Sequence, residues 1–247
     1  MFWKPLSLKP GALDEASRLH NDPTIIQAPV SSVFMASLSA LLSEDLGMRR
    51  SAETGESRLG DGTPVPMISF GLIEYLNSLD LSSYAMLELG GGFSTDFWTA
   101  RAKSVHTLET SAEWARAIAA RNPKAKIELV EEPIAWRISA FDQTFDIIVI
   151  DPAGNRLTCA RASIEKLRPG GFIILDNSDW YPNASKVLRD AGLIEVDFPD
   201  FRPAHHFRTT TSLFLHPDFR PKPKADRLPG VPIGGKYSQI NYWDMEP

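Results

Sequence analysis

The sequence predicts an α/β fold: a doubly wound, mostly parallel seven-stranded sheet with an antiparallel last strand, plus N-terminal helices and a Pro-rich C-terminal tail. Two observations support this prediction. From residue 84 onward, short apolar segments alternate with helix-like segments over short connections, as in parallel βαβ units. From residue 193, two strand-like segments follow one another without a helical pattern between them, so we expect them to pair antiparallel.

The expected elements follow in chain order. Helix-spaced apolar residues predict helices over 31–46 and 68–79, and the polar segment 47–66 between them is predicted to be a loop. Strands are expected over 84–89, 104–109, 126–131, 145–150, 171–176, 193–198 and 211–215. Further helices are expected over 95–102, 111–121, 158–168 and 182–191.

We divide the chain into three parts: an N-terminal helical extension with its loop (1–67), the α/β domain (68–216) and the tail (217–247). The tail is rich in proline, and few of its segments are long enough for a core element. Its aromatic residues Tyr237, Tyr242 and Trp243 are expected to dock on the body or on a partner.

Composition disfavours several classes of protein. The chain has 247 residues, of which 43% are hydrophobic, and a net charge of −5, so it can build a core and lacks a long basic surface for nucleic acid. No apolar run approaches the roughly 20 residues that span a bilayer, and no signal peptide is recognisable. The single cysteine, Cys159, fits a reducing compartment and is expected to be a small buried hydrophobe. We therefore expect a cytoplasmic protein with no membrane partner. A nucleic-acid partner is disfavoured but not excluded, and a homo-oligomer stays open.

The segment that best indicates function is a glycine-rich turn after the first strand of the α/β domain. Glu88 is followed by Gly90, Gly91 and Gly92, which remove every Cβ where the backbone bends, so a ligand can lie against main-chain N–H groups. Dinucleotide-binding turns have the pattern G-x-G-x-x-G, whereas Thr95 occupies the third glycine position here and an acid precedes the loop. This E-x-G-x-G pattern resembles the S-adenosylmethionine loop of the class I (Rossmann-like) methyltransferases.

Further segments extend the resemblance. An apolar strand that ends in an aspartate (FDIIVID) and an L-x-P-G-G step at 167–171 follow in the order found in class I methyltransferases. The segment IILDNSDWY (173–181) and the closing TTSLF strand look like a small group of bacterial methyltransferase-like proteins without an assigned acceptor. The resemblance implies S-adenosylmethionine as cofactor and methyl transfer to a small-molecule acceptor, as in an O-methyltransferase, with 68–216 as the methyltransferase-like domain.

Acidic and glycine residues at the carboxyl ends of the strands are candidates for cofactor binding, because ligands of open α/β sheets bind there. Gly90, Gly91 and Gly92 suit the amino-acid portion and the ribose of the cofactor, and Glu88 and Asp151 lie at the same edge. Glu109, after the second strand, either accepts hydrogen bonds from the ribose hydroxyls or caps the helix that follows. Glu131, after the third strand, either accepts from the adenine amino group or is a solvated loop residue.

Asp151 follows the fourth strand, and Asp176 and Asn177 follow the fifth, so these side chains are expected to converge at one edge of the sheet. Catechol-type O-methyltransferases use such an arrangement to hold Mg²⁺, which prefers oxygen ligands and lowers the pKa of a bound hydroxyl. The resemblance thus implies Mg²⁺ as a second cofactor and a catalytic role for Asp151 and Asp176. Pro152, however, replaces a second acid often found in that family. Alternatively, Asp176 and Asn177 cap the next helix, and Asp151 faces solvent or the cofactor.

Two histidines in the loop between the last two strands are further catalytic candidates. Topology places His205 and His206 over the same edge of the sheet, where a histidine can take a proton from an incoming nucleophile. The alternative is a pair of surface histidines in a Pro-flanked loop. Asp179, Trp180 and Tyr181 lie at this edge as well, where they either shape an acceptor pocket or anchor the loops.

Other functions stay open on the same fold. Aminopropyl transferases usually carry a further Asp pair after the fourth strand, where this chain has Pro152, Ala153 and Gly154, and NAD-dependent oxidoreductases require the glycine that Thr95 replaces. A non-catalytic module that binds partners through its N-terminal helices and tail is the third hypothesis, since a fold alone does not prove activity.

Overall fold

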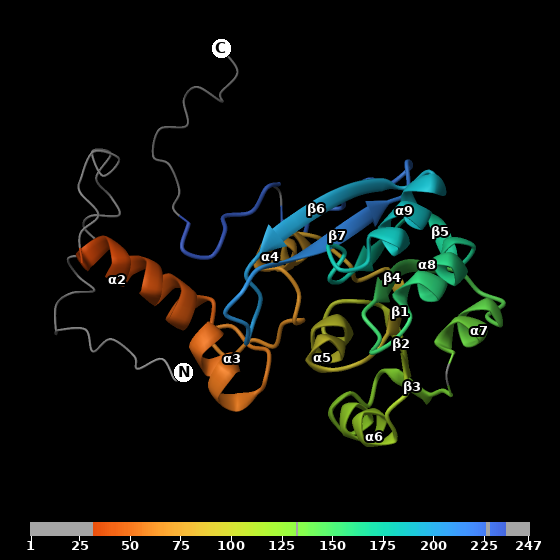
Figure 1. Cartoon of the computed structure of the whole chain (residues 1–247), viewed down its shortest axis with the longest axis horizontal. Coiled ribbons are helices and arrows are strands. Elements are labelled where there is room, and N and C mark those ends of the chain that lie inside the picture. The colour runs from red at the N-terminus through yellow and green to blue at the C-terminus, as the bar shows by residue number, and fades with distance from the viewer. Residues whose placement is uncertain (1–31, 132, 226–227, 236–247) are drawn as a thin grey trace, which may run out of the picture.

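A seven-stranded sheet forms the centre of the computed structural model, which describes residues 32–131, 133–225 and 228–235 (Figure 1). The strands are β1 (Ala85–Leu89), β2 (Ser104–Glu109), β3 (Lys126–Leu129), β4 (Phe145–Ile150), β5 (Leu167–Leu175), β6 (Ile194–Asp200) and β7 (Thr209–Leu215). Their order across the sheet is β3-β2-β1-β4-β5-β7-β6. The strands from β1 to β5 pair in parallel, whereas β7 is antiparallel to both of its neighbours, β5 and β6. The predicted fold class, with its antiparallel last strand, is confirmed.

Helices cover both faces of the sheet (Figure 1). They are α4 (Phe70–Asn77), α5 (Phe93–Thr99), α6 (Ala112–Arg121), α7 (Ile134–Ser139), α8 (Arg156–Ile164) and α9 (Pro182–Asp190). Successive residues of a strand point to opposite faces, so β4 sends Ile147 and Val149 into one buried cluster and Ile148 and Ile150 into the other. The first cluster includes residues of α4 and α5, and the second includes residues of α7, α8 and α9. Burial on both faces explains why this strand is a continuous apolar run.

The N-terminal helices extend away from the sheet, on the left of Figure 1. The predicted first helix is observed as α2 (Ser32–Ala40), which continues as a short π-helix, η2 (Leu41–Asp45). A further helix, α3 (Met48–Thr54), lies within the segment predicted to be a loop. It buries only Ser51, so its sequence carries no apolar periodicity that would predict it.

Two further elements, α7 and β5, also differ from the prediction. The helix α7 has six residues, too few to show a helical period in the sequence. β5 begins at Leu167, so the L-x-P-G-G step lies inside a strand instead of a helix-ending turn. The pairing of β5 with β4 is irregular there, Gly170 has a φ of 80°, and a Cβ on Gly171 would collide with the carbonyl oxygen of Asp146. The two glycines therefore allow β5 to bulge past β4.

The first part of the C-terminal tail packs back onto the domain. Phe219 is buried, and its ring meets that of Phe172 in β5 edge to face at 5.5 Å. Lys222 pairs with Asp80, after α4, at 2.6 Å, and its carbonyl oxygen accepts the Asp80 N–H at 2.8 Å. We call residues 217–224 the C-terminal strap. The aromatic residues predicted to dock, from Tyr237 onward, lie outside the described residues.

Candidate functional site

The glycine-rich turn after β1 is held in shape by contacts with β2, with α6 and with the segment after β4. Gly90 has a φ of 80°, its N–H donates to the Leu108 carbonyl oxygen at 2.9 Å, and a Cβ there would lie 2.5 Å from the Asp151 carbonyl oxygen. A Cβ on Gly91 would lie 2.7 Å from side-chain carbons of Ile118 and Thr107. Gly92 differs, because a Cβ built there would meet nothing closer than 4.0 Å. The turn is thus packed against protein at its first two glycines and open at the third.

Glu109, at the end of β2, fastens this turn to the start of α6. Its carboxylate accepts the Gly91 N–H at 3.0 Å through Oε2, and the N–H groups of Thr110 and Ser111 at 2.8 Å through Oε1. Ser111 in turn caps α6 by accepting the Trp114 N–H. A carboxylate oxygen can accept more than one hydrogen bond, so Oε2 retains capacity for a further donor from a ligand.

Glu88, a predicted cofactor-binding residue, is fully buried beneath the turn, so its carboxylate has no contact with solvent. Its two carboxylate oxygens accept hydrogen bonds from the hydroxyls of Ser94 and Thr95 at 2.6 Å and of Thr107 at 2.8 Å. Burial raises the pKa of Glu88 to about 7, against the opposing effect of these hydroxyls. The acid of the E-x-G-x-G pattern therefore supports the turn from within the core.

Replacing Glu88 with glutamine should remove a pH dependence of stability. Because the folded state raises the pKa of Glu88 from 4.5 to about 7, the folded chain holds this proton more tightly than the unfolded chain does. The contribution of Glu88 is complete below pH 4.5 and falls by about 3 kcal/mol as the pH rises through 7. Urea unfolding of wild type and Glu88→Gln from pH 4.5 to 8 checks this, and parallel curves would contradict the assignment.

Asp176, after β5, is paired with an arginine that sequence reasoning did not find. Asp176 is 1% exposed, and its oxygens accept from Arg202 Nη1 at 2.9 Å and from the Thr211 hydroxyl at 2.8 Å. With its amide nitrogen turned toward Asp176, Asn177 donates to the same carboxylate at 2.9 Å and accepts from Arg202 at 2.8 Å. Burial raises the pKa of Asp176, and the Arg202 guanidinium opposes that rise.

A second arginine pairs with Asp151. Arg156, at the start of α8, donates to Oδ1 of Asp151 and, at 3.0 Å, to the Tyr181 hydroxyl. Burial and the Asp176 carboxylate raise the pKa of Asp151, while Arg156 lowers it. Since 36% of the Asp151 side chain is exposed, solvent screens part of this rise. Within the described residues, no donor is paired with Asp151 Oδ2, so this oxygen is open at the edge of the sheet.

The predicted Mg²⁺ site is not supported. The described residues include no group of three or more His, Cys, Asp or Glu side chains placed to hold a metal ion. Asp151, Asp176 and Asn177 do come to the same edge of the sheet, but Arg156 and Arg202 neutralise the two carboxylates. An arginine in contact with each carboxylate repels a dication and occupies one of the two oxygens of that carboxylate.

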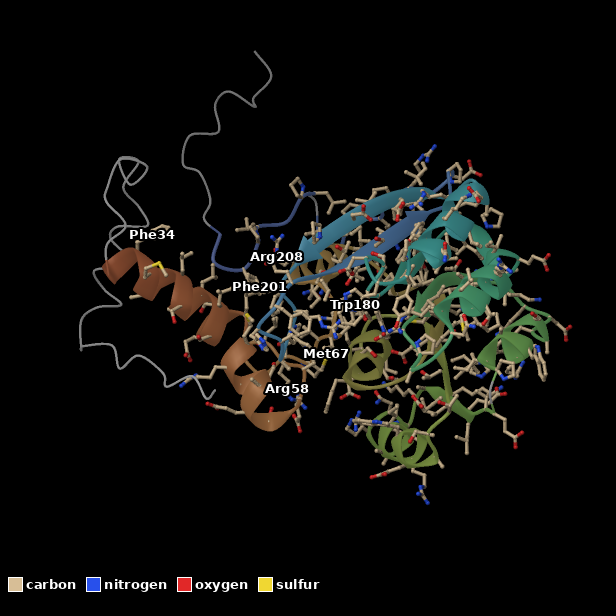
Figure 2. The ribbon with its side chains drawn as sticks, in the orientation of Figure 1. Phe34, Arg58, Met67, Trp180, Phe201 and Arg208 are labelled. Carbon is tan, nitrogen blue, oxygen red and sulfur yellow. The ribbon has the colours of Figure 1, made fainter. Side chains whose placement is uncertain are left out.

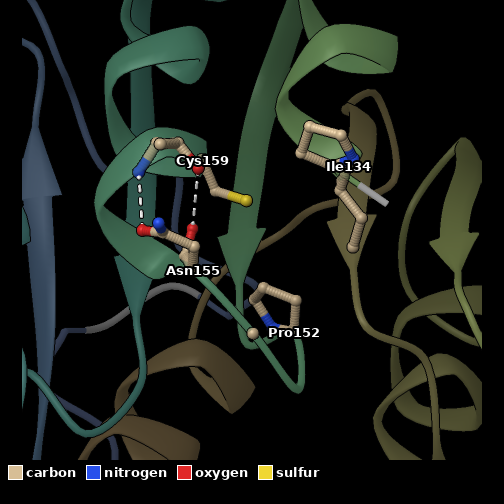
Figure 3. A pocket seen from close by; sticks show the side chains of 7 residues that line it. Ile134, Pro152, Asn155 and Cys159 are labelled. Atoms are coloured by element: carbon tan, nitrogen blue, oxygen red, sulfur yellow. Dashed lines mark hydrogen bonds between the residues drawn. The ribbon is translucent and has the colours of Figure 1, made fainter. Parts of the chain in front are cut away.

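A shallow pocket lies between the start of α7, the segment after β4 and the start of α8 (Figure 3). It has about 210 Å³ of empty volume, part of it open to solvent, and its lining comprises Pro133, Ile134, Pro152, Gly154, Asn155, Thr158 and Cys159. Figure 3 shows the sulfur of Cys159 directed from α8 into this space. Glu131 is exposed next to the pocket, between β3 and α7.

The loop between β6 and β7 (201–208), which we call the histidine loop, carries His205 and His206. His205 is half-buried, and its Nδ1 lies 3.1 Å from the Pro203 carbonyl oxygen, while His206 is exposed. Both imidazoles meet the ring of Phe207 edge on, at 5.1 Å and 5.5 Å. The two histidines thus share a ring contact but differ in exposure.

The sequence matches no model of a protein family and no curated protein. Among solved structures it is similar to fibrillarin of Aeropyrum pernix with bound S-adenosyl-L-methionine, with 15% identity, a TM-score of 0.47, and coverage of 59% of this chain and 74% of the other. Cofactor-bound Rv0187 from MTB shares 19% identity at a TM-score of 0.46, covering 78% of this chain and 100% of that one. The N-methyltransferase NodS of Bradyrhizobium japonicum WM9 with S-adenosyl-l-homocysteine shares 13% identity at a TM-score of 0.41. The match covers 84% of this chain and 99% of that one.

The order of the strands and the reversed direction of β7 decide the fold. This is an α/β, Rossmann-like fold with the antiparallel last strand that the sequence predicts. Within it, Gly90–Gly92, Glu109, Asp151 and Asp176 lie at the carboxyl ends of β1, β2, β4 and β5, whereas Glu88 is buried within β1, Glu131 follows β3, and His205 and His206 lie between β6 and β7. The sequence did not predict Arg156 and Arg202 as parts of the site. Arg202 lies 26 residues from Asp176 along the chain, in a loop with no sequence pattern that would signal the pair.

Proposed function

We propose that the protein is an S-adenosylmethionine-dependent methyltransferase that acts on an oxygen of a small-molecule acceptor. The observation that carries this proposal is the turn after β1, which is fixed at Gly90 and Gly91 and open at Gly92, directly beside the Glu109 carboxylate. A backbone without side chains, next to an acid with spare accepting capacity, suits a ligand that carries both an amino-acid group and a ribose. The lone cysteine, Cys159, agrees with a cytoplasmic location.

The proposed residue roles follow the edge of the sheet. Gly91 and Gly92 would approach the amino-acid portion, Glu109 would accept from the ribose hydroxyls, and Glu131 would lie near the adenine, beside the pocket of Figure 3. Asp151 Oδ2 would face the amino-acid end of the cofactor or the acceptor. The bound cofactor supplies an electrophilic methyl group on a sulfonium centre.

The acceptor side of the site combines a proton acceptor with a buried ion pair. His205 is the proposed base for the acceptor hydroxyl, because it is half-buried at this edge and contacts Arg202, which Asp176 holds in place. Asp176 has both oxygens engaged and is 1% exposed, so its proposed role is to position Arg202 rather than to exchange a proton.

Isothermal titration calorimetry with S-adenosylmethionine and S-adenosylhomocysteine, with NAD as the control ligand, tests the proposal. We expect both sulfur ligands to bind in the micromolar range, NAD not to bind, and added Mg²⁺ to leave the affinities unchanged. Binding of NAD alone would favour the oxidoreductase hypothesis. If none of the three binds, the turn is structural and the partner-module hypothesis replaces this one.

Glu109→Ala should weaken S-adenosylhomocysteine binding about 10-fold or more, because it removes charge-assisted hydrogen bonds to the ribose. Glu113→Ala is the matched control, since Glu113 is an exposed acid in the first turn of α6 for which no ligand contact is proposed. The measurement is calorimetric, and thermal unfolding of each variant shows that it is folded. Equal affinities for wild type and Glu109→Ala would remove Glu109 from the proposed cofactor site.

A further inference from the structure

We propose that the methyl acceptor is an aromatic alcohol whose ring rests on Trp180 and Phe207 and whose hydroxyl proton passes to Nε2 of His205. This inference rests on the proposed function, of which it specifies the substrate class. Three observations support it: an exposed aromatic pair, the fixed backbone that carries this pair, and the proton acceptor beside it.

Trp180 and Phe207 form an exposed aromatic pair at the edge of the sheet where the strands end. Their rings stack with centroids 6.5 Å apart and an angle of 26°, and yet 55% of Trp180 and 40% of Phe207 remain exposed. In Figure 2 Trp180 lies between the N-terminal helices and the sheet. Two large aromatic side chains that stay exposed together indicate a binding surface, and their flat faces favour a flat aromatic ligand.

The backbone that carries Trp180 is fixed to β7. The Asp179 carboxylate accepts the Thr210 N–H at 3.0 Å, and the Ser178 N–H donates to the Thr210 carbonyl oxygen at 2.9 Å. The Trp180 N–H donates to the carbonyl oxygen of Asn177 at 2.8 Å. A ring on a fixed backbone loses little conformational entropy when a ligand stacks on it. Asp179 and the turn at Asn177 thus serve to place Trp180.

His205 adjoins the aromatic pair with its Nε2 prepared to accept a proton. Its Nδ1 is 3.1 Å from the Pro203 carbonyl oxygen, which can only accept, so Nδ1 carries the proton and Nε2 carries the lone pair. Arg202 Nη2 lies 3.5 Å from Nε2, at the outer limit of a hydrogen bond. The His205 ring meets Phe207 at 5.1 Å, so the base and the platform are in contact.

The proposed methyl transfer accounts for every atom, electron pair and proton. The acceptor oxygen forms a bond to the methyl carbon as the carbon–sulfur bond breaks, and the electron pair of that bond stays on sulfur. The hydroxyl proton moves to His205 Nε2 and then to solvent. The chain thereby orients the ring through Trp180 and Phe207 and removes the proton through His205.

The first test is binding of phenol, catechol and naphthol, with cyclohexanol as the saturated control, measured by calorimetry with and without S-adenosylhomocysteine. We expect at least one aromatic alcohol to bind, cyclohexanol to bind at least about 10-fold more weakly, and Trp180→Leu to weaken aromatic binding about 10-fold. Trp136→Leu is the matched control, because Trp136 is 76% exposed on α7 and has no proposed role. S-adenosylhomocysteine affinity should be the same in wild type and both variants.

The second test measures S-adenosylhomocysteine formed from S-adenosylmethionine and the best-binding alcohol. His205→Gln should lower kcat about 100-fold or more while leaving the affinity for the alcohol unchanged, and His216→Gln, after β7, should leave kcat unchanged. Aromatic binding that Trp180→Leu does not alter, or no aromatic binding at all, would overturn the proposal even if the cofactor binds. A change of sedimentation coefficient in Trp180→Leu would identify the aromatic pair as an interface between copies and would also overturn it. Failure of cofactor binding would instead overturn the proposed function.

Discussion

Replacing Arg202 with alanine is expected to lower the free energy of unfolding by about 3–5 kcal/mol, because it leaves the buried Asp176 carboxylate without its partner. Both residues are almost fully buried, with side chains 10% and 1% exposed, so solvent cannot compensate for the loss. Burial already raises the pKa of Asp176, and removal of the guanidinium raises it further. Asp176 then takes up a proton at low pH, so the loss of stability should be smallest in acid and largest above neutral pH.

Urea unfolding of wild type and Arg202→Ala at pH 5 and pH 8 measures this effect. In the double variant Asp176→Asn/Arg202→Ala the destabilisation should be smaller than in Arg202→Ala alone, since no charge is left buried. Arg168→Ala is the control: its side chain is 46% exposed and pairs with Asp146, so about 0–1 kcal/mol is expected. An equal, small loss in Arg202→Ala and Arg168→Ala would show that the buried pair does not hold the site together.

Gly90→Ala is expected to destabilise the protein by more than about 3 kcal/mol and to abolish measurable S-adenosylhomocysteine binding. A φ of 80° is itself unfavourable for alanine, and the added Cβ would lie 2.5 Å from the Asp151 carbonyl oxygen and 2.8 Å from Pro152 Cα. Since both of these atoms belong to the backbone, relief requires that the segment after β4 move away from the turn.

Gly55→Ala separates the cost of the unfavourable φ from the cost of the collision made by the added Cβ. Gly55 has a similar φ of 71°, but a Cβ there would meet nothing within 4 Å, so only the conformational cost of about 1–2 kcal/mol remains. The difference between the two variants in thermal or urea unfolding measures the collision at Gly90. If Gly90→Ala and Gly55→Ala lower the free energy of unfolding equally, the segment after β4 moves aside at no cost. The turn is then less tightly fixed than the structure indicates.

The central strands could be predicted from the sequence because burial on both faces leaves a continuous apolar run. The range 145–150, for example, is both the predicted and the observed strand. The placement of Glu109, Asp151 and Asp176 at one edge of the sheet could also be predicted, because the carboxyl ends of parallel strands share that edge. By contrast, α3 buries a single residue, and local propensity alone is a weak signal for so exposed a helix.

The partners of the acids could not be predicted in the same way. Asp176 and Arg202 meet only because β7 brings the histidine loop back over β5, and a contact between side chains 26 residues apart leaves no local pattern. The sequence therefore suggested oxygen ligands for a metal, where the structure has two acid–arginine pairs. Which charges neutralise one another is a property of the tertiary structure, whereas strand periodicity is a property of a few neighbouring residues.

The C-terminal strap has a consequence for how the domain is made. Phe219 belongs to the same buried cluster as Phe172 and Ile174 of β5 and several residues of α4. During synthesis the sheet can pair as far as β7, yet one face of its core stays incomplete until the strap has left the ribosome. A chain released or cut after Leu215 would expose apolar surface on that face, and we expect it to aggregate and to be degraded rather than to persist as a shorter domain.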